Sequence, residues 1–448
     1  MLTLTLSTQI GFIGIHMSNQ TTIWHPCSQM KDYETFKPLQ IESAQGSYLK
    51  LKNGQKVIDA ISSWWCKSLG HNHPALRVAL LTQLDKFEHV ILANTTNETI
   101  EKLSEKLVSL MPHLNKVFYA GDGSCAIEIA MKMSLHTRVI CGEQQRKHFI
   151  ALKNGYHGET VGALSMSDVG LYKKPYADML LTPNFIEPLY VANTDDPLWH
   201  DASEHWQRVK EHLEALASTT TAILFEPILQ GAGGMLIYSQ DFLRRLCEWA
   251  TENNIHLIAD EIMTGIGRTG KMLASQHANI KPDFVCLSKG LTSGWLSFSA
   301  VLTTNTIYDI FYDDYETGKA FLHSHTFCGN ALGASVALAT LKVIEDENLC
   351  ERADALQKIM MENIIDVKQK TGALHNLRGI GAFVAADLLE DTPRLGYKVF
   401  QEAVKRGALL RPLGNTLYWL PPLTISEETL NQLSNITTTS LKASLKYK

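Results

Sequence analysis

The sequence predicts an α/β protein with a large domain built on a mostly parallel sheet and a smaller α+β domain. From Lys116 to about Thr304, short apolar runs alternate with stretches of helical pattern, which is typical of strand–helix–strand units. After Asn330, a long helical pattern gives way to two strand-like runs flanked by helices. A hairpin pattern near the other end, with Asn53-Gly54 at its turn, supplies further strands. We therefore expect both chain ends to form the smaller domain.

Boundary residues place the individual elements along the chain. The hairpin turn joins YLKLK to KVIDA within residues 41–61, Pro74 is expected to open a helix after His73, and Asn97 is expected to cap a helix that runs to Leu110. The strand candidates of the central part are KVFYA, HFIALK, AILFE, IHLIA, FVCL and SFSAVLTT. Two more are expected near the C-terminus, GAFVAADLL and ALLRPLGNTLYWL.

This order predicts the domain boundaries. Residues 71–335 are assigned to the large domain, and residues 21–70 and 336–448 to the smaller one. Residues 1–20 are expected to be a disordered or mis-assigned leader, because Met17 offers a second start. The first 17 residues lack a basic region and a small-residue cleavage site, so we expect no secretory signal.

Composition narrows the classes of partner. The chain has 448 residues, 45% apolar and 19% charged, which is typical of a globular protein with a large core. A net charge of −5 gives no electrostatic reason to bind nucleic acid or an anionic membrane. No apolar run reaches the ~20 residues of a membrane helix. The eight cysteines are scattered without zinc-ligand spacing, which predicts reduced thiols in the cytoplasm.

Paired histidines do not predict a metal site. His71 and His73 are two positions apart, as are His323 and His325. Two histidines without further ligands are more often capping or loop residues than metal ligands. We therefore expect no metal.

Two charged residues follow consecutive strand candidates. Asp260 ends the run Ile255–Ala259, and Lys289 follows Phe284–Leu287, 29 positions after Asp260. This arrangement suits pyridoxal phosphate chemistry. The lysine would hold the cofactor as a Schiff base, and the acid would keep its pyridine nitrogen protonated.

A glycine-rich turn follows the strand candidate KVFYA. Gly121 and Gly123 allow a tight turn, and a helix that starts near Ser124 would offer free N–H groups to a phosphate. The same letters fit the G-x-G-x-x-A fingerprint of dinucleotide-binding proteins, so a dehydrogenase is an alternative. Glu143 is the best acid for that fingerprint, and it is poorly placed.

Aromatic residues and one arginine complete the candidate site. Tyr156, in the loop NGYHGE, can stack on a flat ring or anchor the loop. Trp64 and Trp65 can pack in the core or at a dimer interface, or can line a substrate pocket. Arg411 lies in the apolar, strand-like context ALLRPLG and needs an anionic partner. That partner is either a protein carboxylate or a substrate carboxylate.

Together these segments resemble class III (ω-type) aminotransferases, which are pyridoxal phosphate enzymes of fold type I. The resemblance covers the chain from about Thr22 onward. It rests on Glu226-Pro227, Ala259–Ile262, Gly265–Gly270, Ser288–Gly290 and His323–Asn330.

The resemblance implies a set of site residues. The cofactor-binding residues would be Gly123, Ser124, Tyr156, Asp260, Ile262, Lys289 and Thr326. Lys289 would form the Schiff base and act in catalysis, Asp260 would bind the pyridine nitrogen, and Tyr156 would cover the ring. Thr326 would reach the phosphate of the neighbouring subunit, which implies a homodimer with shared sites. Substrate would contact Trp64, Trp65, Tyr156 and Arg411.

Five segments point to one branch of the family, which aminates 8-amino-7-oxononanoate in biotin biosynthesis. They are IWHP, SSWW, NGYHG, EPILQGAGGM and RPLGNTLYWLPP. In this branch the amino donor would be S-adenosylmethionine, and Arg411 would hold the acceptor's carboxylate. The alternatives are lysine as donor, another class III aminotransferase acting on ornithine, 4-aminobutyrate or another amine, and a non-catalytic protein that keeps the fold.

This chain departs from the usual family pattern at four places. Cys27 stands where a pocket tyrosine is usual, and Glu159 replaces an aspartate. Asp122 lies in a turn that is commonly Ser-Gly-Ser, and its negative charge near a phosphate is unfavourable unless the side chain points away. Ser324-His325 stands where Gly-Pro is frequent.

Overall fold

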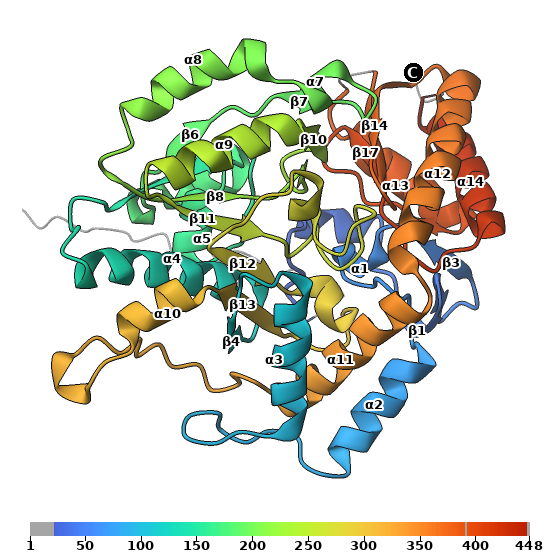
Figure 1. Ribbon diagram of the computed structural model, residues 1–448. Helices are drawn as coiled ribbons and strands as arrows, with labels where there is room; N and C mark the ends of the chain where they lie inside the picture. Colours follow the sequence, from blue (N-terminus) through green and yellow to red (C-terminus); the bar gives the residue numbers. More distant parts are fainter. Residues whose placement is uncertain (1–21, 390–391, 446–448) are drawn as a thin grey trace, which may run out of the picture. The chain divides into compact units, whose positions relative to one another are not determined.

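The computed structural model describes residues 22–389 and 392–445 (Figure 1). The expected leader at residues 1–20 lies outside the described residues. The chain divides into two units, one ending at Gln40 and one beginning at Ile41. The first contains a short 3-10 helix, η1 (Met30–Glu34). In the described part of the chain, no helix is both long enough and apolar enough to span a bilayer.

A seven-stranded sheet forms the centre of the larger unit. Its strand order is β4-β13-β12-β11-β8-β5-β6. Only β13 runs antiparallel to its neighbours, so the expectation of a mostly parallel sheet is confirmed. The strands are β4 (Lys116–Ala120), β5 (His148–Leu152), β6 (Asn184–Ile186), β8 (Thr220–Phe225), β11 (His256–Asp260), β12 (Phe284–Leu287) and β13 (Ser299–Thr303).

Both faces of this sheet are covered. Every residue of β8, β11, β12 and β13 is buried, as expected for strands between two layers. Along β11, Ile258 packs into an apolar cluster with α4 (Gly123–Ile140), whereas its neighbours Leu257 and Ala259 pack into the cluster on the other face. The side chains therefore alternate between two cores.

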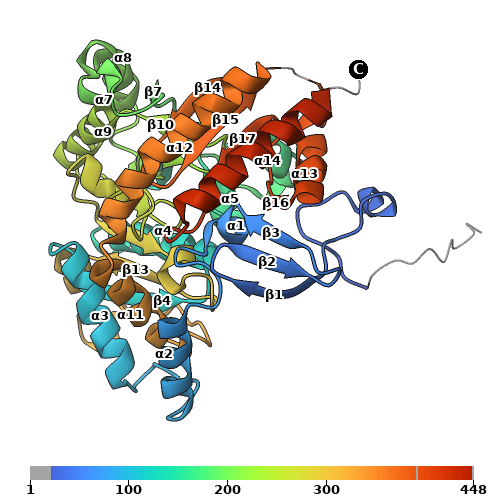
Figure 2. The ribbon, with the colours of Figure 1, turned by 90° about the vertical axis from the view of Figure 1, so that its right-hand side faces the viewer.

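Segments from both chain ends share a smaller sheet. In it, β16 (Ala408–Leu409) pairs in parallel with β3 (Lys56–Asp59), which continues through β2 (Tyr48–Leu51) to β1 (Ile41–Gln45). Figure 2 shows this sheet beside the C-terminal helices. The expectation that both ends form an α+β part is confirmed. The boundaries at 70/71 and 335/336 remain a prediction.

The C-terminal part adds a second small sheet and three helices. The strands β14 (Leu374–Gly379), β15 (Val384–Leu388) and β17 (Thr416–Trp419) form an antiparallel sheet. The helices are α12 (Leu349–Thr371), α13 (Leu395–Arg406) and α14 (Glu427–Leu445). α14 packs against both α12 and α13.

The capping residues define helix ends as expected. α2 (Pro74–Leu84) begins at its proline, and α3 (Glu98–Leu110) begins after Asn97, whose side chain accepts a hydrogen bond from Ile100 N at 3.0 Å. α11 (Ala331–Asp346) begins after Asn330 and packs against α2 and α3.

One expected strand is wrong around Arg411. The run ALLRPLGNTLYWL forms β16 and β17, and Arg411 lies in the connection between them. The cause is local, because Pro412 cannot donate to a strand ladder and Gly414 adopts a φ of +58° in a turn.

The remaining elements are short or peripheral, and most of them were not predicted from the sequence. They are α1 (Ser62–Trp65), α5 (Val161–Met166), α6 (Gly170–Lys173), η2 (Lys174–Met179), β7 (Tyr190–Val191), α7 (Pro197–His200), α8 (Ser203–Glu214), β9 (Leu229–Gln230), β10 (Leu236–Tyr238), α9 (Gln240–Glu252), η3 (Ala274–His277), η4 (Lys289–Thr292), α10 (Asn305–Phe311) and η5 (Tyr315–Thr317).

Candidate active site

Asp260 and Lys289 meet at one edge of the central sheet. Asp260 is the last residue of β11, and Lys289 follows the end of β12 by two positions. Because β11 and β12 are parallel neighbours, their carboxyl ends lie side by side. The expected pairing of an acid with a lysine is therefore present in the fold.

The carboxylate of Asp260 is held by two donors. His157 Nδ1 donates to Oδ2 at 2.8 Å, and Ile262 N donates to Oδ1 at 3.1 Å. Both side chains of the Asp260–His157 pair are buried, and His157 Nε2 has no hydrogen-bond partner among the described residues. Both oxygens of Asp260 thus have a fixed donor, and a carboxylate in a fixed orientation suits a partner for a protonated ring nitrogen.

His157 was missing from the sequence prediction. It follows Tyr156 in the loop NGYHG, after β5, and β8 separates β5 from β11 in the sheet. Its position beside the predicted Tyr156 was the only available signal. The contact itself depends on strand order, which the local sequence does not encode.

The amino group of Lys289 lies in an aromatic setting. Its Nζ is 4.7 Å from the ring centre of Trp65, and it makes no hydrogen bond or ion pair to any described residue. Burial lowers the pKa of Lys289, while the charges of Asp260 and Glu226 act in the opposite direction. A lysine amine with a lowered pKa is a better nucleophile and proton carrier at neutral pH.

The glycine turn forms an anion-binding helix start. α4 begins at Gly123, and the N–H groups of Gly123 and Ser124 have no acceptor among the described residues. A Cβ atom on Gly123 would lie only 2.9 Å from Cδ1 of Ile262, so a side chain there would collide. Two free N–H groups at the start of an 18-residue helix suit a phosphate.

Asp122 caps the same helix. Its Oδ1 accepts a hydrogen bond from Cys125 N at 3.0 Å, and its Oδ2 accepts one from Cys125 Sγ at 3.3 Å. The carboxylate is therefore engaged with the first turn of α4. This geometry explains how an acidic residue is accommodated beside the free N–H groups of Gly123 and Ser124.

The loop after β5 brings Tyr156 to the same edge. Glu226 Oε2 accepts a hydrogen bond from Tyr156 N at 2.9 Å, and Glu159 Oε1 accepts one from the Tyr156 hydroxyl at 2.8 Å. Burial raises the pKa of Glu226 to about 7. A Cβ atom on Gly158 would lie 2.1 Å from Ser124 Oγ, which shows how closely this loop packs on the start of α4.

The tryptophan pair lies in a strained turn. Four consecutive residues, Ser62 to Trp65, have positive φ between 48° and 81°. For residues other than glycine this conformation costs roughly 1–2 kcal/mol each. Asp59 holds the turn by accepting hydrogen bonds from Ser63 N at 3.0 Å and Ser63 Oγ at 2.8 Å. Strain of this kind is concentrated at functional sites.

The two tryptophan side chains of this turn have different surroundings. Trp65 is buried, and its Nε1 donates to the Tyr418 hydroxyl at 3.0 Å. Trp64 is 40% exposed, and the guanidinium carbon of Arg411 lies 4.2 Å from its ring centre. Trp65 thus packs in the core with its ring beside the Lys289 amine, whereas Trp64 forms a cation–π pair with the predicted carboxylate-binding arginine.

Thr326 is placed differently from the other predicted residues. Its side chain is exposed, and its hydroxyl has no hydrogen-bond partner among the described residues. Its carbonyl oxygen accepts a hydrogen bond from His89 Nε2 at 2.8 Å. The backbone is therefore anchored while the side chain faces outward. Cys27 lies in the separate unit that ends at Gln40, and it has a φ of +49°.

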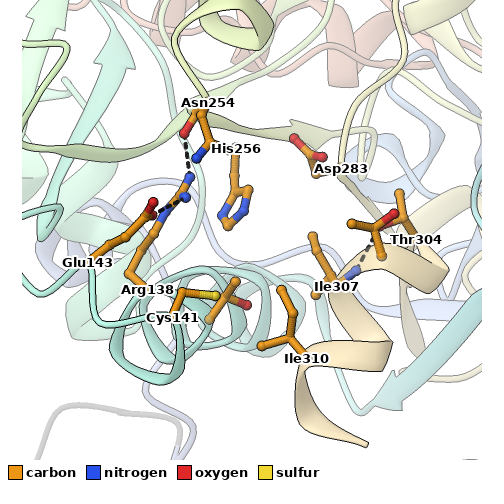
Figure 3. A pocket seen from close by; sticks show the side chains of 11 residues that line it. Arg138, Cys141, Glu143, Asn254, His256, Asp283, Thr304, Ile307 and Ile310 are labelled. Atoms are coloured by element: carbon orange, nitrogen blue, oxygen red, sulfur yellow. Dashed lines mark hydrogen bonds and ion pairs between the residues drawn. The ribbon is translucent and has the colours of Figure 1, made fainter.

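A cavity of about 360 Å³ lies at the opposite edge of the sheet (Figure 3). His256, the first residue of β11, and Asp283, just before β12, line it. Arg138 lies beside them and is bound to Glu143 Oε2 at 2.7 Å and Asn254 O at 2.7 Å. None of the predicted site residues lines this cavity, so it is separate from the candidate active site.

Comparison with known proteins identifies the family. The model of the aminotransferase class III family matches residues 29–441. An adenosylmethionine-8-amino-7-oxononanoate aminotransferase from Helicobacter pylori is 43% identical over 411 residues, covering 91% of this chain and 92% of the relative. One of the same name from Methanocaldococcus jannaschii is 35% identical over 429 residues, covering 91% and 93%.

Solved structures agree with this result. The crystal structure of the Methanocaldococcus jannaschii enzyme superposes with a TM-score of 0.86 at 33% identity, covering 94% of this chain and 97% of that one. A pyridoxal phosphate-bound amine transaminase from an uncultivated Pseudomonas species also gives 0.86, at 28% identity, covering 95% and 99%. Together with the lysine, the carboxylate and the free N–H groups at the sheet edge, these matches decide between the alternatives of dehydrogenase, binding protein and transaminase. The chain belongs to the class III aminotransferase family and is a pyridoxal phosphate-dependent aminotransferase.

Proposed function

We propose that this chain transfers an amino group to 8-amino-7-oxononanoate and so forms 7,8-diaminononanoate in biotin biosynthesis. S-adenosylmethionine is the favoured donor, and lysine is the alternative. This chain aligns with more than nine-tenths of the length of two relatives. The names of both include this acceptor and this donor.

The observation that carries this proposal is the Trp64–Arg411 pair. The Lys289 amine faces the Trp65 ring, and the adjacent Trp64 ring faces the Arg411 guanidinium. One aromatic ring of the pair thus lies beside the reacting amine, and the other lies beside a cation. An aliphatic acceptor with a distal carboxylate matches this order, because its chain gains apolar contact and its carboxylate gains a charge-assisted bond.

The residues at the sheet edge have separate proposed roles. Bound pyridoxal phosphate supplies an electron sink for the negative charge that develops at the substrate carbon. The N–H groups of Gly123 and Ser124 bind the phosphate, and Ile262 and Tyr156 enclose the ring. Asp260 holds a proton at the pyridine nitrogen, while His157 keeps that carboxylate in place.

Lys289 has two proposed roles. Its Nζ forms the covalent attachment of the cofactor and then carries a proton to and from the reacting carbon. The lowered pKa of this amine favours both, because the amine gives up its proton more readily than an exposed lysine does. The two half-reactions would share one site, so the kinetics should be ping-pong.

A homodimer with shared sites is part of the proposal. Thr326 has an exposed hydroxyl, and four large apolar side chains near it in the sequence are between 60% and 88% exposed: Tyr312, Tyr315, Leu322 and Phe327. Exposed apolar groups concentrated in one segment favour an interface, and a two-fold dimer would place two copies of Thr326 symmetrically. We expect this dimer to work in the cytoplasm.

The test uses the anchor residue and a matched lysine. Lys289→Ala should leave no borohydride-reducible link to the cofactor and should abolish formation of 7,8-diaminononanoate. Lys67→Ala removes a nearby amine that donates to Gly294 O at 2.9 Å, and it should keep the link. Turnover of 4-aminobutyrate or ornithine with another keto acceptor, and none with 8-amino-7-oxononanoate, would overturn the assignment of substrate.

A further inference from the structure

The segment His323–Asn330 is fastened to its own chain on both sides of Thr326. Three hydrogen bonds hold the segment in place. They join Lys132 Nζ to His323 Nδ1 at 2.9 Å, His89 Nε2 to Thr326 O at 2.8 Å, and Cys328 Sγ to Tyr119 O at 2.9 Å. Tyr119 belongs to β4, which leads directly into the phosphate-binding turn. The segment is therefore tied to the strand that positions that turn.

His325 makes a fourth and more direct contact. Its Nε2 accepts a hydrogen bond from Gly121 N at 3.2 Å. A Cβ atom on Gly121 would lie 2.9 Å from His325 Cε1, so the imidazole would have to shift to admit any larger residue there. Because Nε2 accepts, the neutral ring carries its proton on Nδ1, which is buried without a partner among the described residues.

Side chains bind Gly121 at both its N–H and its carbonyl oxygen. Ser297 Oγ donates to the Gly121 carbonyl oxygen at 2.5 Å, on the other side from the N–H that His325 binds. Both main-chain polar groups of Gly121 are thus held by side chains. Immediately afterwards come Gly123 and Ser124, whose N–H groups remain available to a phosphate. The orientation of those donors depends on the peptide that precedes them.

We infer that His325 is a positioning residue that couples the two cofactor sites of the dimer. In its own subunit it fixes the Gly121 turn that binds one phosphate. Through the main chain it also fixes the adjacent Thr326, which serves the phosphate in the partner's site. This inference rests on the proposed shared-site dimer. Loss of the imidazole in one subunit weakens cofactor binding at both sites.

The contact depends on the residue type at position 325. Ser324-His325 stands where the family frequently has Gly-Pro, and neither glycine nor proline has a side chain that accepts a hydrogen bond. In this chain the imidazole supplies a direct link between the segment and the turn.

Hybrid dimers test the coupling. Two differently tagged subunits are co-expressed, and the first carries Lys289→Ala, so only the wild-type second subunit can form a borohydride-reducible link. The apo-dimer is titrated with pyridoxal phosphate, and the label trapped on the second subunit gives its half-saturation concentration. The first subunit also carries His325→Ala, His325→Gln or Thr326→Ala. Melting temperature and elution volume check that each hybrid is folded and dimeric.

The expected result is a loss of affinity in a subunit whose own sequence is unchanged. His325→Ala in the first subunit should raise the half-saturation concentration at the second site roughly two- to tenfold, the effect of one hydrogen bond. His325→Gln should restore it, because the glutamine oxygen reaches the place of Nε2. Thr326→Ala should raise it as well. The reverse hybrid, with His325→Ala in the labelled subunit, should also bind more weakly.

Three outcomes would overturn the inference. If Thr326→Ala weakens the second site and His325→Ala does not, the sites are shared but His325 does not couple them. If His325→Ala acts only in the labelled subunit, its role is local. If Thr326→Ala has no effect across the interface, the shared site fails and the coupling fails with it.

Discussion

His157 Nδ1 lies 2.8 Å from Asp260 Oδ2, and both side chains are buried at the carboxyl edge of the sheet. With Ile262 N on the other oxygen, each carboxylate oxygen has one fixed donor. A carboxylate held this way loses little freedom when it binds a protonated ring nitrogen. Preorganised charges of this kind account for a large share of enzymatic rate enhancement.

The first prediction concerns this pair. His157→Ala should lower kcat roughly ten- to a hundredfold, because a hydrogen bond to a charged group contributes about 1.5–3 kcal/mol. The pH titration of the bound cofactor's absorption band should shift as well. His157→Asn, whose amide nitrogen takes the place of Nδ1, should retain most of the activity. Equal loss in both variants, with an unchanged titration, would indicate a packing role only.

The sequence predicts the sheet edge well because the relevant signals are local. Apolar runs of four to six residues give the buried strands. Asp260 ends one of these strands, and Lys289 follows the end of another by two positions. These strands happen to be neighbours in the sheet, so proximity in sequence becomes proximity in space. His157 and the contact between Gly121 and His325 were not predictable in the same way. Both join segments at least 100 residues apart, across a strand order that no local pattern specifies.

The tryptophan turn shows a second limit. Nothing in Ser62–Trp65 favours positive φ, since the segment contains no glycine or asparagine. The conformation is imposed by Asp59 and by the Leu420 carbonyl, which accepts a hydrogen bond from Ser62 Oγ at 2.7 Å. Tertiary contacts override local preference here. The position of Arg411, in contrast, could have been read from Pro412, which argues against a continuous strand.

The second prediction separates the substrate role of Arg411 from a structural role. Arg411→Ala should raise the KM for 8-amino-7-oxononanoate roughly ten- to a hundredfold, because a charge-assisted pair contributes about 1.5–3 kcal/mol. Arg411→Lys should recover only part of the loss, since lysine keeps the charge but loses the planar stack on Trp64.

Arg352 provides the matched control for this prediction. Its guanidinium donates to Leu423 O at 2.8 Å and Ile425 O at 2.7 Å, which are both main-chain groups. Arg352→Ala should therefore lower the melting temperature and leave the acceptor KM nearly unchanged. An Arg411→Ala enzyme with that same behaviour would assign Arg411 to stability.

The third prediction concerns acid stability and the edge of the sheet opposite the active site. Burial, with help from the charges of Arg138 and Arg146, lowers the pKa of His256 from 6.5 to about 3. In the unfolded chain His256 is protonated below about pH 6.5, whereas in the folded chain it is protonated only below about pH 3. Stability from this residue is thus complete above the unfolded pKa, and it is lost as the pH falls through this window. At about pH 5 the loss should be on the order of 2 kcal/mol.

Urea unfolding at about pH 7.5 and pH 5 measures this effect. The comparison variant is His256→Asn, whose amide can replace the contact of Nδ1 with Ser134 Oγ at 2.9 Å. The wild-type chain should lose more stability between the two pH values than the variant does. Equal losses would show that groups other than His256 control the acid response.

The fourth prediction concerns the amino donor and Cys27. The family resemblance implies a tyrosine where this chain has Cys27. A phenol can both hydrogen-bond and stack, and a thiol is a poor substitute for either. Cys27→Tyr should therefore lower the concentration of S-adenosylmethionine needed for half-maximal conversion, by up to about tenfold for one hydrogen bond plus a ring contact. Cys27→Ala should change it little. The strain of a positive φ is common to all three residues and cancels in this comparison.

A single-turnover assay decides the donor. The bound cofactor's absorbance is followed after mixing with S-adenosylmethionine or with lysine, in the absence of acceptor, so that only the donor half-reaction is observed. Conversion by S-adenosylmethionine, with a gain in Cys27→Tyr, supports the proposed donor. Conversion by lysine alone would replace the donor and leave the acceptor assignment intact, because Trp64 and Arg411 are proposed to recognise the acceptor. A Cys27→Tyr enzyme that binds S-adenosylmethionine no better than Cys27→Ala would show that this chain recognises its donor with residues other than the one at position 27.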